Sequence, residues 1–323
     1  MFYGGSTSAA SIVEFRDGAF QPILSPGDQP LGATFAGINI YGQAQRTPNG
    51  DLYAQLANGI GRYIDGKWDL AIPIPTKIDD VTATNIARIA VNANGAIAWA
   101  CNTDKGDIRI YLSQDGRHQL IATNGLYTQA GAVIDGQAVA SFDDFFVDDL
   151  NRIFIRLRFR GATSPVLYVW SQGTWKLALK LFETPIAGRP VTGWTLRAIG
   201  SRFFAILQNS AGAYVTEWTS GGWQILLTPT DVMPTGIPLG AIYNHFEPDA
   251  AGGMAFLGSA FPSNMLYVRK NNQTSTVLST ARRTADGDLL VNILSIDFRD
   301  DGGVWVLALN ERSELVLYQA QLK

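Results

Sequence analysis

Five ionisable residues stand at comparable distances before a tight turn in successive copies of a repeated strand: Arg88, Asp144, His245, Glu247 and Asp297. If those strands converge on a channel, the five side chains form a ring of mixed sign at its mouth. Such a ring would suit a small polar ligand, or a hydrolase with a general base and a cationic group that orients the substrate. The alternative is that they form salt bridges and caps between neighbouring repeats. We assign no catalytic residue, and an enzyme would draw on Asp144, His245, Glu247 and Asp297.

The acidic residues around position 145 suggest calcium binding as a second chemistry. Asp143 and Asp144 precede two phenylalanines, and Asp148 and Asp149 follow them. Clustered carboxylates can hold Ca²⁺ through oxygen ligands. The alternative is that Asp148 and Asp149 form the turn that comes next, and the chain has no Asp-x-Asp-x-Asp-Gly loop. We therefore expect no cofactor. Ca²⁺ is the alternative, and its ligands are left unassigned.

The scarce histidines and the single cysteine exclude several kinds of site. With 2 His in the chain, a multi-histidine metal centre is excluded, and no Ser-His-Asp order can be drawn. His118 follows a turn and is expected at a solvated sheet edge. Cys101 stands alone in an apolar strand, so we expect a buried thiol that behaves as a small hydrophobe.

Three tryptophans occupy equivalent positions shortly after a tight turn: Trp68, Trp175 and Trp223. Repeated aromatic platforms can stack on sugar rings, which would make the protein a lectin. The alternative is that each tryptophan fills the gap between neighbouring repeats with a large apolar surface. Packing is the favoured interpretation, because Phe20, His118, and either Thr274 or Ser275 replace the tryptophan in other copies.

These residues are carried by a repeat that runs through the chain. A tight turn recurs with a step of about 50 residues over the second half of the sequence, a period typical of blade repeats. The turns fall at Asn49-Gly50, Asn94-Gly95, Asn151-Arg152, Ser201-Arg202, Gly252-Gly253 and Gly302-Gly303.

Each copy contains four predicted strands. An inner strand precedes the turn, an apolar strand follows it, and a third strand with an aromatic residue leads through a second turn to an outer strand. The predicted inner strands are residues 38–43, 85–91, 139–147, 194–199, 241–246 and 292–298.

Four antiparallel strands with a return connection describe a blade of a β-propeller. The sequence therefore predicts an all-β propeller of four-stranded antiparallel blades. Seven blades are slightly favoured, and the alternative is six blades in which the N-terminal hairpin closes the last blade. We expect one propeller domain over residues 1–323, and its incomplete end copies favour an origin in a longer protein.

The repeat resembles bacterial repeat proteins whose units read Asn-x-x-Gly, an apolar strand, an aromatic third strand, Asp-Gly, and an outer strand ending in Pro-Gly-Asp. Residues 92–99, 63–66 and 26–28 carry that pattern. Many such propellers belong to exported proteins and present binding surfaces, which is what the resemblance implies here. Neither the Trp-Asp of the WD repeat nor the paired glycines of kelch units recur.

Composition narrows the partners. The 323 residues carry a formal charge of -3, with a pI near 5.4, so there is no basic footprint for nucleic acid. No apolar run is long enough for a signal peptide or a membrane span. We therefore expect no membrane insertion, and an extracellular or cell-surface location follows from the resemblance. Composition does not indicate an oligomeric state.

Three functions follow from these observations. The favoured one is a binding or interaction module of an exported or cell-surface protein, with a protein or glycan ligand. The enzymatic alternative is a channel-mouth hydrolase, lactonase or lyase, with Ca²⁺ as its candidate cofactor. The third is a purely structural domain of a multidomain protein.

Overall fold

The computed structural model describes residues 2–4, 11–16, 19–33, 35, 44–47, 49–124, 132–249, 251–260, 263–280, 282–298 and 303–321. The chain divides into two compact units, Met1–Leu179 and Lys180–Lys323. The described residues form strands, turns and one short 3-10 helix, η1 (Pro30–Gly32), which confirms the all-β prediction. None of the helical segments described is long and apolar enough to cross a membrane.

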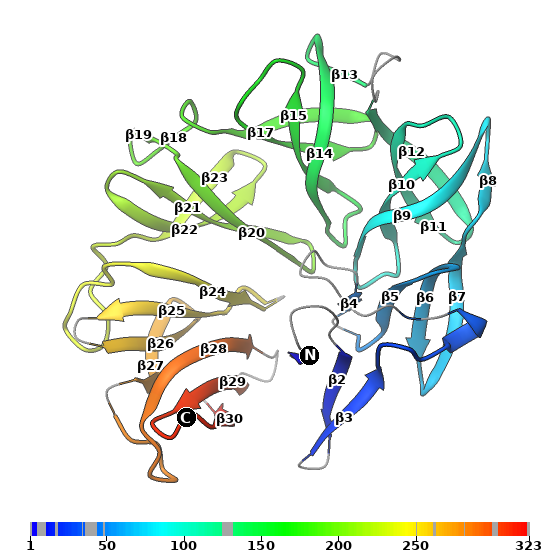
Figure 1. The fold of residues 1–323 in the computed structure, drawn as a ribbon. Coiled ribbons are helices and arrows are strands. Elements are labelled where there is room, and N and C mark those ends of the chain that lie inside the picture. The colour runs from blue at the N-terminus through cyan, green and yellow to red at the C-terminus, as the bar shows by residue number, and fades with distance from the viewer. Residues whose placement is uncertain are drawn as a thin grey trace. The chain divides into compact units, whose positions relative to one another are not determined.

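The first unit holds four sheets whose strands are hydrogen-bonded in sequence order (Figure 1). The first sheet has β1 (Phe2–Gly4), β2 (Ser11–Arg16) and β3 (Ala19–Leu24), and the second has β4 (Ala44–Arg46), β5 (Leu52–Leu56), β6 (Gly59–Ile64) and β7 (Lys67–Pro73). The third has β8 (Thr76–Ile78), β9 (Val81–Val91), β10 (Ile97–Thr103), β11 (Ile108–Gln114) and β12 (Arg117–Asn124). The fourth has β13 (Val133–Ile134), β14 (Gln137–Val147), β15 (Ile153–Phe159), β16 (Val166–Ser171) and β17 (Thr174–Lys180).

The second unit repeats this meander. After the hairpin of β18 (Pro185–Ile186) and β19 (Arg189–Pro190), one sheet has β20 (Gly193–Ile199), β21 (Arg202–Asn209), β22 (Gly212–Thr219) and β23 (Gly222–Leu227). The next has β24 (Ile242–Pro248), β25 (Met254–Ala260), β26 (Ser263–Lys270) and β27 (Gln273–Ser279). The last has β28 (Leu290–Phe298), β29 (Gly303–Asn310) and β30 (Leu315–Gln321).

An antiparallel meander of four strands is the topology of a propeller blade, so the predicted β-propeller class is confirmed. Of the predicted inner strands, the segment at residues 38–43 lies outside the described residues, and the other five form β9, β14, β20, β24 and β28. The blade number and the single domain stay predictions.

In the sheets that begin with β4, β8, β13 and β24, the last two strands form an outer hairpin, and the backbone conformation of its turn explains the residues found there. Asp65, Asp115, Gln172 and Asn271 all have φ near +50°, a left-handed conformation that short polar residues tolerate. Glycine follows three of them, and Asn272 follows Asn271, because two successive positive φ angles match the twist of the hairpin strands.

Side chains close the turn between the first two strands. The Asn92 Oδ1 accepts from the backbone N of Ala96 at 2.9 Å, and the Asp249 Oδ1 accepts from the backbone N of Gly253 at 2.5 Å. These contacts satisfy backbone donors that the ladder leaves free, which is why asparagine and aspartate recur before the turn.

Neighbouring sheets within each unit bury their apolar faces against one another. On β10, Ile97, Trp99 and Cys101 pack with the preceding sheet, while Ala98 and Ala100 pack with the following sheet. Successive side chains of a strand point to opposite faces, so a strand between two sheets must be apolar on both. This explains the nearly continuous apolar runs in the second strands.

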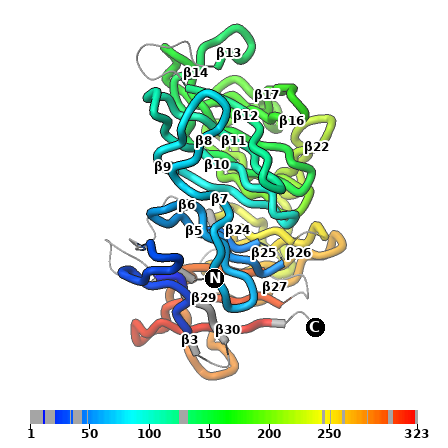
Figure 2. Tube along the Cα trace, turned by 90° about the vertical axis from the view of Figure 1, so that its right-hand side faces the viewer, coloured from blue at the N-terminus to red at the C-terminus, as the bar shows by residue number. Residues whose placement is uncertain are grey.

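The connections between sheets are more ordered than the sequence suggested. Three of these connections each contain a hairpin, namely β8–β9, β13–β14 and β18–β19 (Figure 1, Figure 2). The first strand of each hairpin buries one isoleucine: Ile78, Ile134 and Ile186. Tyrosines on β16 and β30 bond to the connections that precede their sheets. The Tyr168 hydroxyl donates to Asp135 Oδ2 at 2.6 Å, and the Tyr318 hydroxyl donates to Asp288 Oδ2 at 2.6 Å.

Candidate functional site

Two of the predicted ring residues meet in the first unit. Arg88 on β9 and Asp144 on β14 belong to neighbouring sheets, and the Arg88 Nη2 lies 2.5 Å from the Asp144 Oδ1. Their side chains are 24% and 23% exposed, so water reaches both. This contact is the salt bridge between repeats that the sequence analysis held as the alternative to a ligand-binding ring.

The neighbouring carboxylate is also matched by arginines. Asp143 Oδ2 lies 3.0 Å from the Arg158 Nε and 3.5 Å from the Arg156 Nε. Ser141 Oγ donates to the Asp143 Oδ1 at 3.3 Å. Three guanidinium groups therefore surround two carboxylates, and this charge balance opposes a cation. Within the described residues, no group of three or more His, Cys, Asp or Glu side chains could hold a metal ion.

Asp148 and Asp149 form the turn and link two sheets. Asp148 Oδ1 accepts from the backbone N of Arg152 at 2.9 Å, and Asp148 Oδ2 accepts from the Arg152 Nε at 2.6 Å. Burial raises the pKa of the Asp148 carboxyl, while the bonds to Arg152 oppose that change. Asp149 Oδ1 accepts from the backbone N of Ala93 at 2.8 Å. The Asp148 carboxylate thus acts as a turn former, and the Asp149 carboxylate links its turn to the neighbouring sheet.

In the second unit, Arg197 on β20 lies beside Glu247 on β24, with 3.5 Å between the Arg197 Nε and the Glu247 Oε1. Burial raises the pKa of the Glu247 carboxyl; Asp297 on β28 adds to this effect and Arg197 opposes it. The Glu247 side chain is still 37% exposed. A carboxyl with a raised pKa that solvent reaches is suited to proton transfer. His245 contributes its backbone to β24, and its side chain lies outside the described part of the chain.

Each of the three predicted tryptophans is partly buried and packs on an aromatic ring of its own outer hairpin. The ring centroids are 5.3 Å apart for Trp68 and Tyr63, 6.3 Å for Trp175 and Tyr168, and 5.2 Å for Trp223 and Trp218. Trp68 and Trp175 also pack against clusters that include the preceding sheet. Separations of this size are typical of stabilising aromatic pairs.

His118 lies on β12, the edge strand of its sheet, as expected, but it is only partly solvated. Its ring is partly buried, 6.0 Å from the Trp99 ring in an edge-to-face arrangement. The Trp99 Nε1 donates to the Ser113 Oγ at 2.7 Å, and a second hydrogen bond of 2.7 Å joins the Ser113 Oγ and the His118 Nδ1. Burial lowers the pKa of His118, with Asp79 opposing the change. Its position in the hairpin is that of Trp68 in another copy, but its contacts with Ser113 and Trp99 could not be predicted from the sequence.

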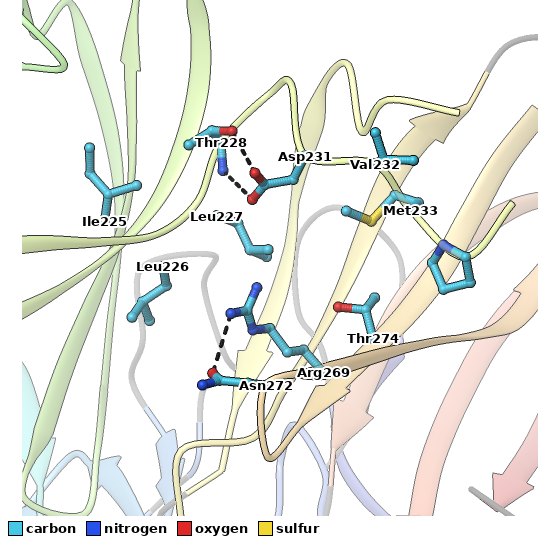
Figure 3. Close-up of a pocket in the computed structure, with 11 residues that line it drawn as sticks. Ile225, Leu226, Leu227, Thr228, Asp231, Val232, Met233, Arg269, Asn272 and Thr274 are labelled. Atoms are coloured by element: carbon cyan, nitrogen blue, oxygen red, sulfur yellow. Dashed lines mark hydrogen bonds between the residues drawn. The ribbon is translucent and has the colours of Figure 1, made fainter. Parts of the chain in front are cut away.

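The outer hairpin of β26 and β27 departs from the tryptophan pattern. Thr274 pairs directly with Arg269 across the hairpin, as Trp68 pairs with Tyr63 and Trp223 with Trp218. A groove with a volume of about 720 Å³ opens beside Thr274, towards the end of β23 in the preceding sheet (Figure 3). It is lined by Ile225, Leu226, Leu227, Thr228, Asp231, Val232, Met233, Pro234, Arg269, Asn272 and Thr274.

The two charged residues of the groove, Asp231 and Arg269, differ in their hydrogen bonds. Asp231 Oδ2 accepts from the backbone N of Thr228 at 2.9 Å, and Asp231 Oδ1 accepts from the Thr228 Oγ1 at 2.9 Å. Arg269 projects between the apolar walls and donates from Nη2 to the Asn272 Oδ1 at 3.3 Å (Figure 3). Sequence analysis did not assign this site, although Thr274 in place of a tryptophan was a signal for it.

A second pocket, of about 630 Å³, lies in the first unit beside the turn of β11 and β12. It is lined by Leu112, Gln114, Asp115, Arg117, His118, Gln119 and Asn151. Asn151 Nδ2 donates to the Gln114 Oε1 at 3.1 Å, so part of its polar lining is already paired.

Comparisons with known proteins give likenesses in structure and none in sequence. No protein-family model matches the chain, and no curated protein matches significantly. Similar solved structures include an extracellular domain of a hybrid two-component system from B. thetaiotaomicron, at 13% identity and a TM-score of 0.46 over 98% of this chain. The chain spans 36% of the length of that protein.

In two further structures the similarity extends over most of both chains. The β-propeller domain of the Trilobed protease from Pyrococcus furiosus is 12% identical, with a TM-score of 0.49 over 88% of this chain and 83% of that one. A gluconolactonase from Xanthomonas campestris is 12% identical, with a TM-score of 0.40 over 88% of this chain and 87% of that one. These likenesses carry no argument about activity.

Proposed function

We propose that the protein is a binding module and that the groove between the end of β23 and the outer hairpin of β26 and β27 is its ligand site. The observation that supports this is an open groove of about 720 Å³ where other outer hairpins carry a tryptophan. Ligand sites typically have volumes of about 300–1,000 Å³ and combine apolar walls with a few polar groups. The ligand is a protein or a glycan, as the repeat pattern indicates.

The groove is a better candidate than the predicted ring of charges. In the first unit, Arg88 and Asp144 already neutralise each other across 2.5 Å, so a ligand would have to break that pair. In the groove, Arg269 pairs with no carboxylate of the described residues, and a ligand can bind it without displacing an ion pair. The groove therefore presents an available charge beside apolar surface.

The resemblance to repeats of exported proteins supports an extracellular or cell-surface location for the module. An acidic pI near 5.4 agrees with a partner other than nucleic acid. Labelling of intact cells with a membrane-impermeant reagent, followed by detection of the protein, tests the location.

The binding function can be tested by filling the groove. Thr274→Trp restores the residue found at the equivalent place in other copies, and Ser275→Trp is the matched control because Ser275 is exposed on the same strand and does not line the groove. The wild type and both variants are screened on a glycan array and against a displayed peptide library. We expect ligands that bind the wild type and Ser275→Trp but not Thr274→Trp. Ligands that bind all three equally would contradict the groove as the site.

A second candidate function rests on Glu247. Its raised pKa, with Asp297 contributing, suits a general acid or base of a hydrolase, lactonase or lyase. A panel of lactones and esters is assayed with the wild type and Glu247→Gln, with and without Ca²⁺. Turnover that Glu247→Gln abolishes would favour the enzyme. If no substrate turns over and no ligand is found, the purely structural role is favoured.

A further inference from the structure

We propose that the groove binds an extended acidic peptide segment of a protein partner, with a bulky apolar side chain in the space left by Thr274 and a carboxylate on Arg269. This inference rests on the proposed binding function and selects protein over glycan. Three features of the groove support it: the chemistry of its walls, its unmatched cation and the strand edge beside it.

Apolar residues make up part of the groove lining, beside polar ones. Six of the lining residues are aliphatic or otherwise apolar, namely Ile225, Leu226, Leu227, Val232, Met233 and Pro234. Among the described residues the lining has no aromatic side chain, so they offer no flat platform for the face of a sugar ring. Leu227 and Met233 are buried at the base of a cluster that continues into Tyr267 and Phe256. A ring from a partner would extend this cluster as Trp68 extends its own.

The charge favours a carboxylate. A guanidinium has five N–H donors, and Arg269 uses one of them on Asn272 at 3.3 Å. Asp231 is the acidic residue of the lining, and both its oxygens are held by Thr228 within their own turn. An incoming carboxylate could therefore pair with Arg269 through two parallel hydrogen bonds, which are stronger than bonds between neutral groups. Arg269 is therefore the group of the groove that can receive a carboxylate, although Asp231 balances its formal charge in the lining.

The backbone favours an extended segment. β23 is the last strand of its sheet, so within the described residues one of its edges pairs with no strand. The last three residues of this strand, Ile225 to Leu227, line the groove together with Thr228, which follows them. The register shifts there, because Val215 pairs with Leu227 and Thr216 with Ile225, which leaves Leu226 at a bulge. A peptide that pairs with an open strand edge gains backbone hydrogen bonds, and pockets for alternate side chains supply specificity.

The experiment selects peptides and then measures them. A library of random linear peptides displayed on phage is selected on the immobilised full chain, and synthetic winners with a fluorescent label are titrated by anisotropy. We expect winners with Asp or Glu within two residues of a bulky apolar residue. We expect Thr274→Trp and Arg269→Met each to weaken binding by about tenfold or more, which corresponds to about 1.4 kcal/mol. Ser275→Trp should bind within a factor of about two of the wild type, and added salt should weaken binding.

Thermal unfolding of every variant checks that the fold is intact, and Thr274→Phe is a second groove-filling variant that should also lose binding. Winners without acidic residues, or winners that bind Thr274→Trp as tightly as the wild type, would overturn the inference. If glycans bind the wild type but not Thr274→Trp, and no peptide does, the peptide inference fails while the binding function stands. If neither class of ligand distinguishes Thr274→Trp from the wild type, both fail.

Discussion

The outer hairpins β6–β7 in the first unit and β26–β27 in the second have the same strand register but differ in the side chain at one position. Trp68 sits across from Tyr63 and fills the space beside its sheet, with 5.3 Å between ring centroids. Thr274 sits across from Arg269 and leaves a groove of about 720 Å³. The backbone pairing is the same in both hairpins, so the side chain at this position accounts for the difference within the hairpin. A groove can therefore open beside a repeat that lacks one large residue, without a change in the pairing of its strands.

The two units also differ in how an arginine is paired. In the first unit, Arg88 is paired with Asp144 across two sheets. In the second unit, Arg269 pairs with an amide and with no carboxylate among the residues described. We interpret the first as an arrangement for stability and the second as one for binding.

The largest effect is expected when the filled hairpin is made like the open one. Trp68→Thr removes an aromatic ring that packs on Tyr63 and on the preceding sheet, and should lower the free energy of unfolding by about 2 kcal/mol, less than for a fully buried tryptophan. Urea denaturation measures the change. Lys67→Thr, at an exposed position on the same strand, is the control and should change it by less than about 0.5 kcal/mol. Equal effects of the two variants would show that Trp68 does not pack as described.

The next effect concerns the paired arginine. A double-mutant cycle with Arg88→Met and Asp144→Asn should give a coupling of about 1 kcal/mol, because both side chains are largely withdrawn from water. The same cycle on Arg62 and Asp69, which are 39% and 55% exposed, should give less than about 0.5 kcal/mol. Arg269→Met should likewise change stability by less than about 0.5 kcal/mol. A cost for Arg269→Met as large as that for Arg88→Met would erase the distinction between the two arginines.

Filling the open hairpin should have a smaller effect, of opposite sign. Thr274→Trp places an indole against Leu227 and Met233 and should raise the free energy of unfolding by up to about 1 kcal/mol through apolar burial. Ser275→Trp on the exposed face should give no increase. A marked loss of stability for Thr274→Trp, measured by the same urea denaturation, would mean that the groove does not accept a ring.

The smallest effect concerns a third kind of outer hairpin, in which Ser113 pairs with His118. Burial lowers the pKa of His118 in the folded protein below its usual value of about 6.5. The unfolded chain therefore binds the proton more readily, and stability falls as the pH drops below about 6.5 towards the folded pKa. His118→Asn keeps an acceptor for Ser113 and cannot titrate, so its melting temperature should fall less steeply between pH 7.5 and 5. A slope as steep as that of the wild type would contradict a buried neutral imidazole.

Much of the local structure could be predicted from the sequence. Tight turns with aspartate, asparagine and glycine are encoded by residues next to one another, because they depend on backbone conformations that few side chains allow. The strands around them follow from apolar periodicity, and five of the predicted inner strands are confirmed. The tryptophan positions could be predicted for the same reason, since a fixed number of residues after the turn fixes the face of the strand.

Contacts between distant segments could not be predicted in this way. Nothing in the spacing indicated that Arg88 would choose Asp144, that Ser113 would hold His118, or that the connections would form hairpins around Ile78 and Ile134. Each of these depends on which face of one sheet meets which face of another.

The sequence by itself determined that this chain is a series of antiparallel four-stranded units, because turn chemistry and strand periodicity act over a few residues. The tertiary structure decided which charges are neutralised and where a groove opens. The sequence shows only that one hairpin has no tryptophan. The groove exists because the end of β23 and the segment around Met233 form its sides, and their position depends on packing between sheets.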